Sequence, residues 1–244
     1  MEEFRGSVVG EGEPTSRLTG MEPVAPAERS VTETPSHRLF AAIYDPATWV
    51  AERTMLRPHR KYLVRNLEGR VLDLGAGTGP MFPHFAGGDR PLDLHAIEPD
   101  PHMRKRAQRR AGKLGLDVEI RGDRAEALSY ADDSFDTVVA ALVFCTIPDV
   151  ETALSEVARV LKPGGEFRFL EHVAADGWRA RLQTHLNPLW KRAAGGCHLT
   201  RRTPGTFADR EELEVVEIER LDTGITPVRP FVRGRLVRRK DSHR

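Results

Sequence analysis

The feature that most constrains the fold is an alternation of two kinds of segment between residues 70 and 173. Short apolar runs predict β-strands at residues 70–74, 92–97, 117–121, 137–144 and 166–173. Longer segments between them, such as 102–114 and 150–161, have the spacing of amphipathic helices. Such an alternation predicts an α/β fold with a doubly wound, mainly parallel sheet covered on both faces. Ligands bind such sheets at the carboxyl ends of the strands, so site residues should follow strands.

The segments that flank this alternation predict further elements. Residues 213–220 and 228–236 indicate a strand pair, which raises the sheet to about seven strands with an antiparallel C-terminal strand. Residues 38–50 mix aromatic and aliphatic side chains, and we expect a helix that breaks near Asp45 and Pro46. Residues 51–67 also have a helical pattern, whereas no clear rhythm of strands and helices follows Val173.

Composition defines the ends of the expected domain. The chain has 244 residues, 39% hydrophobic and 30% charged, which favours one globular domain at residues 35–236 with N-terminal lid helices at 35–67. Residues 1–34 hold seven acidic residues and three arginines, and we expect a disordered acidic segment. Residues 229–244 hold seven Arg or Lys and one Asp, so we expect 237–244 to be a basic tail. We prefer a solvated tail to an anionic-membrane contact.

Composition also argues against several classes of protein. A net charge of +1 argues against general nucleic-acid binding. The longest strongly apolar run, residues 138–145, is far shorter than the roughly 20 residues of a membrane-spanning helix. The start of the chain has no basic and apolar signal pattern, so we expect a cytoplasmic protein. The two cysteines form no C-x-x-C pair, and we expect no metal site.

The strongest motif is a glycine loop directly after the first predicted strand. Gly75, Gly77 and Gly79 alternate with other residues, and Asp73 precedes them. Glycine lets the backbone turn tightly and lets a ligand approach it. The G-x-G-x-G spacing differs from the G-x-G-x-x-G of nicotinamide binders. Glu98, at the end of the second strand, can accept both hydroxyls of a ribose, and together these features suggest S-adenosylmethionine.

Residues 70–172 resemble class I S-adenosylmethionine-dependent methyltransferases, the Rossmann-like group that includes ubiquinone and menaquinone C-methyltransferases. The matching blocks are residues 71–79, 97–100 with Met103, 125–128, 132–136 and 159–165. The resemblance implies that the cofactor is held by Asp73, Gly75, Ala76, Gly77, Gly79, Glu98, Pro99, Met103, Asp123, Arg124, Ala125, Glu126, Ala141 and Leu142. In such enzymes the loop at 123–126 meets the adenine edge, but Arg124 stands where a small polar or acidic residue is usual.

Candidates for the acceptor side follow the fourth and fifth predicted strands. The catalytic candidates are His172, His185 and His198. We expect His172 at the rim of the cleft, where a neutral imidazole can take a proton from a thiol; its alternative role is in the scaffold. The remaining candidates for substrate contact or for a lid are Phe144, Cys145, Trp190, Tyr44 and Asp45. For Tyr44 and Asp45 the alternative to a lid is a helix packed on the sheet edge.

A second resemblance concerns the acceptor. Residues 171–173, Leu186-x-Pro188-x-Trp190 and residues 196–201 look like a methyltransferase-like subgroup whose animal members methylate alkyl thiols. This implies a small-molecule acceptor, most directly a thiol. The animal proteins begin with an apolar membrane anchor, whereas the N-terminal segment here is acidic and polar, so their location is not implied. The alternatives are C- or N-methylation of a quinone or phospholipid head group, and a cofactor-binding regulatory protein without turnover.

Overall fold

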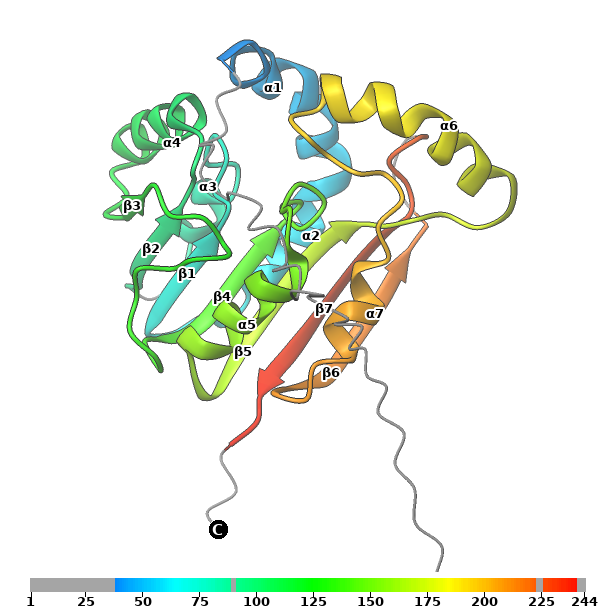
Figure 1. Cartoon of the computed structure of the whole chain (residues 1–244). Coiled ribbons are helices and arrows are strands. Elements are labelled where there is room, and N and C mark those ends of the chain that lie inside the picture. Colours follow the sequence, from blue (N-terminus) through cyan, green and yellow to red (C-terminus); the bar gives the residue numbers. More distant parts are fainter. Residues whose placement is uncertain (1–37, 89–90, 223–225, 241–244) are drawn as a thin grey trace, which may run out of the picture. The chain divides into compact units, whose positions relative to one another are not determined.

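A computed structural model describes residues 38–88, 91–222 and 226–240 (Figure 1). The predicted disordered segment at 1–34 therefore lies outside the described residues. One sheet in the order β3-β2-β1-β4-β5-β7-β6 forms the centre of the fold. Its strands are β1 (Arg70–Leu74), β2 (Asp93–Ile97), β3 (Glu119–Arg121), β4 (Phe135–Ala141), β5 (Leu161–His172), β6 (Leu213–Leu221) and β7 (Phe231–Arg238). Strands β1 to β5 pair in parallel and β7 pairs antiparallel with β5 and β6, which confirms the predicted fold class.

Helices cover both faces of this sheet. They are α1 (Arg38–Ala51), the π-helical turn η1 (Glu52–Leu56), α2 (Arg57–Leu63), α3 (Phe82–Phe85), α4 (Pro101–Leu114), α5 (Val150–Val160), α6 (Gly177–Ala193) and α7 (Thr203–Ala208). Successive side chains of a strand point to opposite faces, so Val138 packs with α5 and α7 while Val139 packs with α2, α3 and α4. The two resulting cores make the central strands apolar on both faces, which is why they were visible in the sequence.

In the flanking segments one prediction was wrong, two helices were missed and one boundary was misplaced. Helix α1 continues through Pro46 instead of breaking there, and the Thr48 hydroxyl donates a hydrogen bond to the carbonyl of Tyr44 at 2.8 Å. Helices α6 and α7 were not predicted; α6 fully buries only Gln183 and so lacks an apolar stripe. The expected basic tail from residue 237 begins later, because β7 runs to Arg238. The guanidinium of Arg238 donates to the Asp133 carboxylate and to the Leu161 carbonyl.

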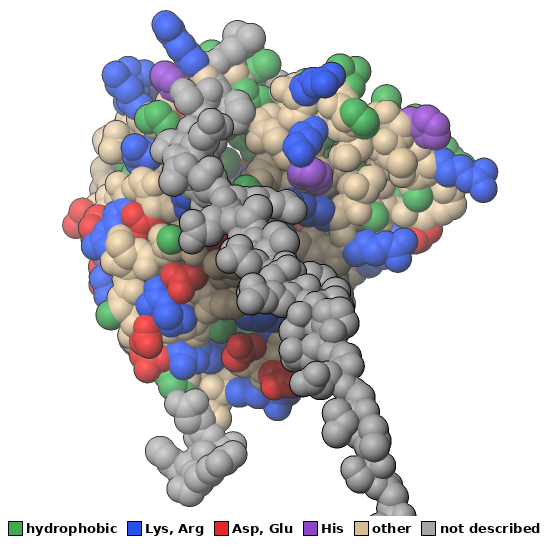
Figure 2. All heavy atoms as spheres, in the orientation of Figure 1, with side chains coloured by type: hydrophobic (Ala, Val, Ile, Leu, Met, Phe, Trp, Pro, Cys, Tyr) green, Lys and Arg blue, Asp and Glu red, His purple; other side chains and the backbone are tan. Residues whose placement is uncertain are grey.

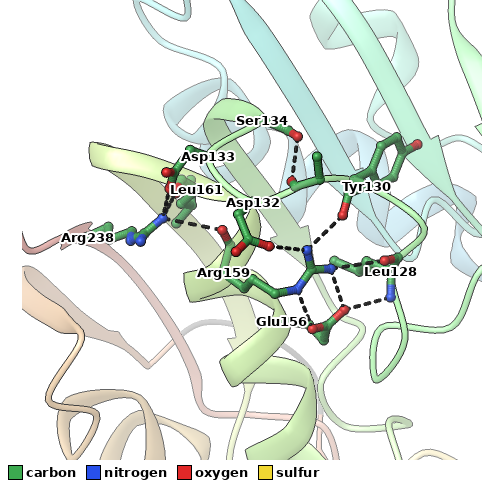
Figure 3. A network of polar contacts seen from close by, with 10 residues as sticks. Leu128, Tyr130, Asp132, Asp133, Ser134, Glu156, Arg159, Leu161 and Arg238 are labelled. Atoms are coloured by element: carbon green, nitrogen blue, oxygen red, sulfur yellow. Dashed lines mark hydrogen bonds and ion pairs between the residues drawn. The ribbon is translucent and has the colours of Figure 1, made fainter.

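The loop between β3 and β4 is held against α5 by a single arginine (Figure 3). The Arg159 guanidinium donates to the carbonyls of Leu128 at 3.0 Å and Tyr130 at 2.8 Å, and to the Asp132 carboxylate at 2.8 Å. Glu156, one helical turn earlier, pairs with the same guanidinium at 2.7 Å. Asp132 and Arg159, which belong to two of the blocks that match the family pattern, therefore help to hold this loop in place.

Charged and apolar side chains share the surface. Figure 2 shows Lys and Arg over most of the visible face, with acidic side chains among them mainly in its lower half. Large apolar side chains are exposed on α1, at Trp49 and Val50, and on α6, at Trp178 and Leu189. Within the described ranges, none of the helices combines the length and the apolar character needed to cross a membrane.

Candidate functional site

The glycine loop after β1 leaves one glycine open to a ligand. Gly75, Gly77 and Gly79 have φ angles of 73°, 58° and 82°, a region that favours glycine. A Cβ on Gly75 would lie 2.1 Å from Cγ2 of Val143, and one on Gly79 would lie 2.7 Å from the ring of Phe82. These two glycines are therefore needed for packing. A Cβ on Gly77 would meet no atom of the described residues within 4 Å, so among these residues its backbone faces open space that a ligand can fill.

Glu98 ends β2 next to this open glycine. Its Oε2 accepts a hydrogen bond from the Gly77 backbone N–H at 2.8 Å, and its Oε1 accepts one from Asp100 N–H at 2.9 Å. Burial raises the pKa of Glu98, while the two backbone donors act in the opposite direction. Each carboxylate oxygen keeps a second acceptor position, so the group can also accept hydroxyl donors.

Two buried ionisable side chains of opposite charge type, Asp73 and Arg60, lie near the glycine loop. Asp73 is buried, and its Oδ2 has no hydrogen-bond partner among the residues described. Burial raises its pKa to about 7, although Arg60 lowers it. Arg60, on α2, is fully buried and donates through Nε and Nη2 to Glu52, both at 2.7 Å. Its Nη1 is also without a partner in the described structure. The sequence did not indicate this arginine, because it lies in a basic run typical of a solvated helix.

Helix α1 is tied to the glycine loop through Asp45. Oδ1 of Asp45 accepts a hydrogen bond from the Thr78 hydroxyl at 2.6 Å, and its Oδ2 pairs with Arg110 of α4 at 3.0 Å. The neighbouring Tyr44 packs edge-on against Phe40, with ring centroids 5.5 Å apart. Burial raises the pKa of Tyr44 to about 12. Of the two residues predicted for a lid, Asp45 therefore contacts the glycine loop, whereas Tyr44 packs on Phe40 within α1.

The other residues implied for the cofactor lie around the same strand ends. Met103 is buried on α4, and Pro99 precedes that helix. Ala141 ends β4, and Leu142 follows it with a φ of 63°. In the loop at 123–126, Oδ2 of Asp123 accepts from the backbone and hydroxyl of Ser129 at 2.9 and 2.5 Å. Ala125 is buried, and Arg124 pairs with Glu126 at 3.4 Å.

Two cysteines and a histidine meet where β4 and β5 end. His172, the last residue of β5, has its Nε2 3.0 Å from Sγ of Cys197. Cys145 follows β4, and the candidate ligand atoms of all three side chains lie within 4.8 Å of one another. The indole N–H of Trp190 donates to Sγ of Cys197 at 3.3 Å. We call these three residues the Cys-His group; no metal site was expected from the sequence, because its members are far apart along the chain.

The environment of this group sets the charges of its thiols. The hydrogen bond with Cys145 lowers the pKa of Cys197, and His172 acts in the same direction. The same contact raises the pKa of Cys145. Burial lowers the pKa of His172, but Cys197 more than compensates, so the pKa is raised. The expected position of His172 on an open rim was wrong, since its side chain is only 3% exposed and faces a cysteine.

The acceptor-side candidates His185, His198 and Phe144 lie outside the Cys-His group. His185 is exposed on α6, with Nδ1 2.7 Å from the Arg181 carbonyl in the preceding turn. The backbone N–H of His198 donates to the Cys145 carbonyl at 2.9 Å. Phe144 is fully buried, 4.9 Å from the ring of Phe207 between centroids, so it packs in the core instead of facing a substrate. Trp190 does reach the site, through Cys197.

A cavity of about 1360 Å³ lies between the N-terminal helices and helices α3 and α4. It is lined by residues of α1, η1 and α2 together with α3 and α4, among them Asp45, Glu52, His84 and Arg110. The open glycine, Glu98 and the Cys-His group do not line it. We therefore locate the candidate site from the strand ends and not from this cavity, which shares only the lid with it.

Comparisons with known proteins agree with this arrangement. The model of a methyltransferase domain matches residues 72–169. Human thiol S-methyltransferase TMT1A is 30% identical over 82% of this chain and 83% of its own length. Phosphatidylethanolamine N-methyltransferase of Cereibacter sphaeroides is 36% identical over 44% of this chain and 53% of its own. A SAM-dependent methyltransferase structure from Methanosarcina mazei covers 70% of this chain and 93% of its own, with a TM-score of 0.57 and 19% identity.

At 19% identity, the Methanosarcina mazei structure shows only that the fold is shared. The human relative, in contrast, matches along most of both chains. The glycine loop, the acid at the end of β2 and the whole of strands β2, β3 and β4 lie within the matched residues. The chain is therefore an S-adenosylmethionine-dependent methyltransferase that belongs to the family of human TMT1A.

Proposed function

We propose that this enzyme transfers the methyl group of S-adenosylmethionine to the sulfur of a small-molecule thiol. The observation that carries the proposal is the position of residues 186–201, which resemble the thiol-methylating subgroup. The guanidinium of Arg201 donates to the Phe144 carbonyl at 2.5 Å, and His198 N–H donates to that of Cys145. This segment thus packs on the chain that leaves β4, at the carboxyl edge where ligands of such sheets bind.

The residues around the glycine loop fit the cofactor. The methionyl part of S-adenosylmethionine carries an ammonium and a carboxylate. The free Oδ2 of Asp73 suits the ammonium, and the free Nη1 of Arg60 suits the carboxylate. Gly77 leaves room for close approach, and the remaining acceptor positions of Glu98 suit the ribose hydroxyls. Two buried polar atoms without hydrogen-bond partners are costly unless a ligand pairs with them.

For methyl transfer from this donor, the main task of the protein is to align the donor with the acceptor. When bound, S-adenosylmethionine supplies an electrophilic methyl group on a sulfonium sulfur. Asp45 holds α1 on the glycine loop through Thr78. Holding donor and acceptor in line can supply most of the rate enhancement. A thiol also has to lose its proton, because free thiols have a pKa of about 8.5.

Methylation of a phospholipid head group is the second candidate. It is favoured by the similarity to phosphatidylethanolamine N-methyltransferase, which covers 44% of this chain. The match to the thiol S-methyltransferase covers 82% of it. We prefer the thiol for this reason. Vesicles that contain phosphatidylethanolamine provide the direct comparison.

The acceptor class can be tested by supplying acceptors in parallel. The purified enzyme receives S-adenosylmethionine with an alkyl thiol, an amine, a phenol, a quinol or phosphatidylethanolamine vesicles, and release of S-adenosylhomocysteine is measured. We expect release with the thiol. Release only with the vesicles would favour the second candidate, and release with none would contradict both. A Gly77→Ala variant controls for a contaminating activity, because its cofactor space is filled.

A further inference from the structure

The Cys-His group is assembled from three separate parts of the chain. Cys145 comes from the loop after β4, His172 from the end of β5, and Cys197 from the segment after α6. All three side chains are buried, with exposed fractions of 3%, 3% and 8%. Nδ1 of His172 has no hydrogen-bond partner among the described residues, whereas buried polar atoms usually have one. The group is therefore polar, enclosed and incompletely satisfied.

Its composition and spacing match a metal site. Zinc binds cysteine sulfur at about 2.3 Å and histidine nitrogen at about 2.0–2.1 Å, so two sulfurs around a tetrahedral ion are about 3.8 Å apart. The three candidate ligand atoms lie within 4.8 Å of one another, so small side-chain shifts suffice to surround one ion. Two cysteines and one histidine also form a known catalytic zinc set that leaves the fourth position open.

The surroundings of the group suit a metal-bound thiolate. The Trp190 indole N–H donates to Sγ of Cys197 at 3.3 Å, and donors of this kind orient and stabilise ligand sulfurs. The loop that carries Cys145 also contacts the cofactor loop, because Val143 occupies the space next to Gly75. Cys145 thus lies two residues from a side chain that packs against the cofactor loop.

We propose that Cys145, His172 and Cys197 bind one zinc ion, and that the acceptor thiol takes its fourth position. The binding of zinc stands by itself; the role of the ion rests on the proposed thiol methylation. Zinc prefers thiolate and imidazole ligands, and a thiol that coordinates it is deprotonated. This supplies the thiolate that the reaction needs.

The reaction is then a single displacement in which atoms and charges balance. The acceptor thiol releases its proton to solvent on binding the ion. Its sulfur forms a bond to the methyl carbon, while the bond from that carbon to the sulfonium sulfur breaks and leaves its electron pair on that sulfur. The products are a methyl thioether, S-adenosylhomocysteine and one proton. A thioether is a much weaker zinc ligand than a thiolate, so the product leaves the ion.

The first test measures metal without turnover. The intact enzyme, purified with and without added zinc, is analysed for bound metal by elemental mass spectrometry, and we expect one zinc per chain. Loading with cobalt(II) should give cysteine-to-cobalt charge-transfer bands. These report on this site alone, because the chain has only two cysteines. Failure of the reduced protein to bind either ion would overturn the proposal.

Variants separate the site from the fold. Cys197→Ser and His172→Gln should lower bound zinc at least tenfold while S-adenosylmethionine binding, measured by calorimetry, shows that the fold persists. Trp190→Phe keeps all three ligands and should weaken zinc binding roughly 10-fold. His185→Ala is the matched control for zinc content, because that exposed histidine lies outside the group. Equal zinc content in wild type and Cys197→Ser would contradict the assignment.

The role of the ion is tested by adding an alkyl thiol to the cobalt-loaded enzyme without S-adenosylmethionine. Coordination of the thiol should change the cobalt spectrum, and removal of the metal should abolish thiol methylation until zinc returns. A spectral change without methyl transfer would leave the site standing and refute the proposed function. Full methylation of thiols by metal-free enzyme would refute the role of the ion and leave the proposed function intact.

Discussion

The Asp45 carboxylate of helix α1 accepts a hydrogen bond from the Thr78 hydroxyl of the glycine loop at 2.6 Å. The same carboxylate pairs with Arg110 of α4 at 3.0 Å. One side chain therefore connects the N-terminal helix, the cofactor loop and the helix that follows β2. Movement of α1 away from the loop has to break both contacts, so this helix can act as a lid whose closure depends on Asp45.

Removal of this link should weaken cofactor binding. In Asp45→Ala both contacts are lost, and we expect S-adenosylmethionine affinity to fall by about 1 kcal/mol, the scale of a partly exposed hydrogen bond and ion pair. Thr78→Val should have a smaller effect, because Arg110 still holds Asp45. Calorimetry measures both. Asp93→Ala is the control, since that carboxylate pairs with Arg70 at the opposite end of the sheet. Unchanged affinity in Asp45→Ala would leave α1 as a packing helix.

The open glycine gives a second prediction. Gly77→Ala adds a methyl group into space that the protein leaves empty, at a φ of 58°. We expect a loss of roughly 1–2 kcal/mol in stability from the left-handed backbone and a much larger loss of cofactor affinity. Gly115→Ala is a matched control, because Gly115 has a φ of 62° and equally open surroundings at the end of α4. Similar cofactor affinities in the two variants would exclude Gly77 from the site.

Arg60 gives a third prediction. Arg60→Lys keeps the charge next to Glu52 but removes the free Nη1. We expect S-adenosylmethionine to bind about tenfold more weakly, the scale of one hydrogen bond to a charged group. A decarboxylated analogue of the cofactor should bind wild type and variant equally, because the contact made by Nη1 is to the carboxylate. If the variant loses affinity for both ligands alike, Arg60 acts on the fold and not on the carboxylate.

Asp73 should make stability depend on pH. Burial raises its pKa from an ordinary value of 3.8 to about 7, so between these values the folded protein holds a proton that the unfolded chain has released. The free energy of unfolding of cofactor-free enzyme should therefore fall as pH rises from about 4 to about 7. Asp73→Asn carries no such proton. Urea unfolding at about pH 5 and about pH 8 should show wild type losing stability relative to the variant. A difference that is the same at both pH values would contradict the assignment.

The sequence predicted the residues of the cofactor loop but not the contact between the two cysteines. Gly75, Gly77 and Glu98 were visible because they follow strongly apolar strands, whose position the periodicity fixes within a few residues. The link between Cys145 and Cys197 was not visible. It depends on the path of α6, which buries almost none of its own side chains and therefore carries no amphipathic pattern.

Arg60 was missed for a related reason. Arg60 belongs to a run at residues 57–61 that holds three other basic residues. Such runs are usually solvated. Only the packing of α2 against the sheet shows that this one guanidinium is fully buried and paired with Glu52. Local patterns therefore identified the cofactor loop, whereas the charges and thiols that come from distant segments required the tertiary structure.

A single-turnover experiment tests most directly whether this methyltransferase acts on sulfur. The enzyme is mixed in excess with S-adenosylmethionine that carries a deuterated methyl group and with one simple alkyl thiol, and the products are identified by mass spectrometry. We predict a deuterated methyl thioether and one equivalent of S-adenosylhomocysteine, with neither formed by Gly77→Ala. Bound cofactor that remains unreacted with the thiol but methylates an amine or a quinol would contradict the account.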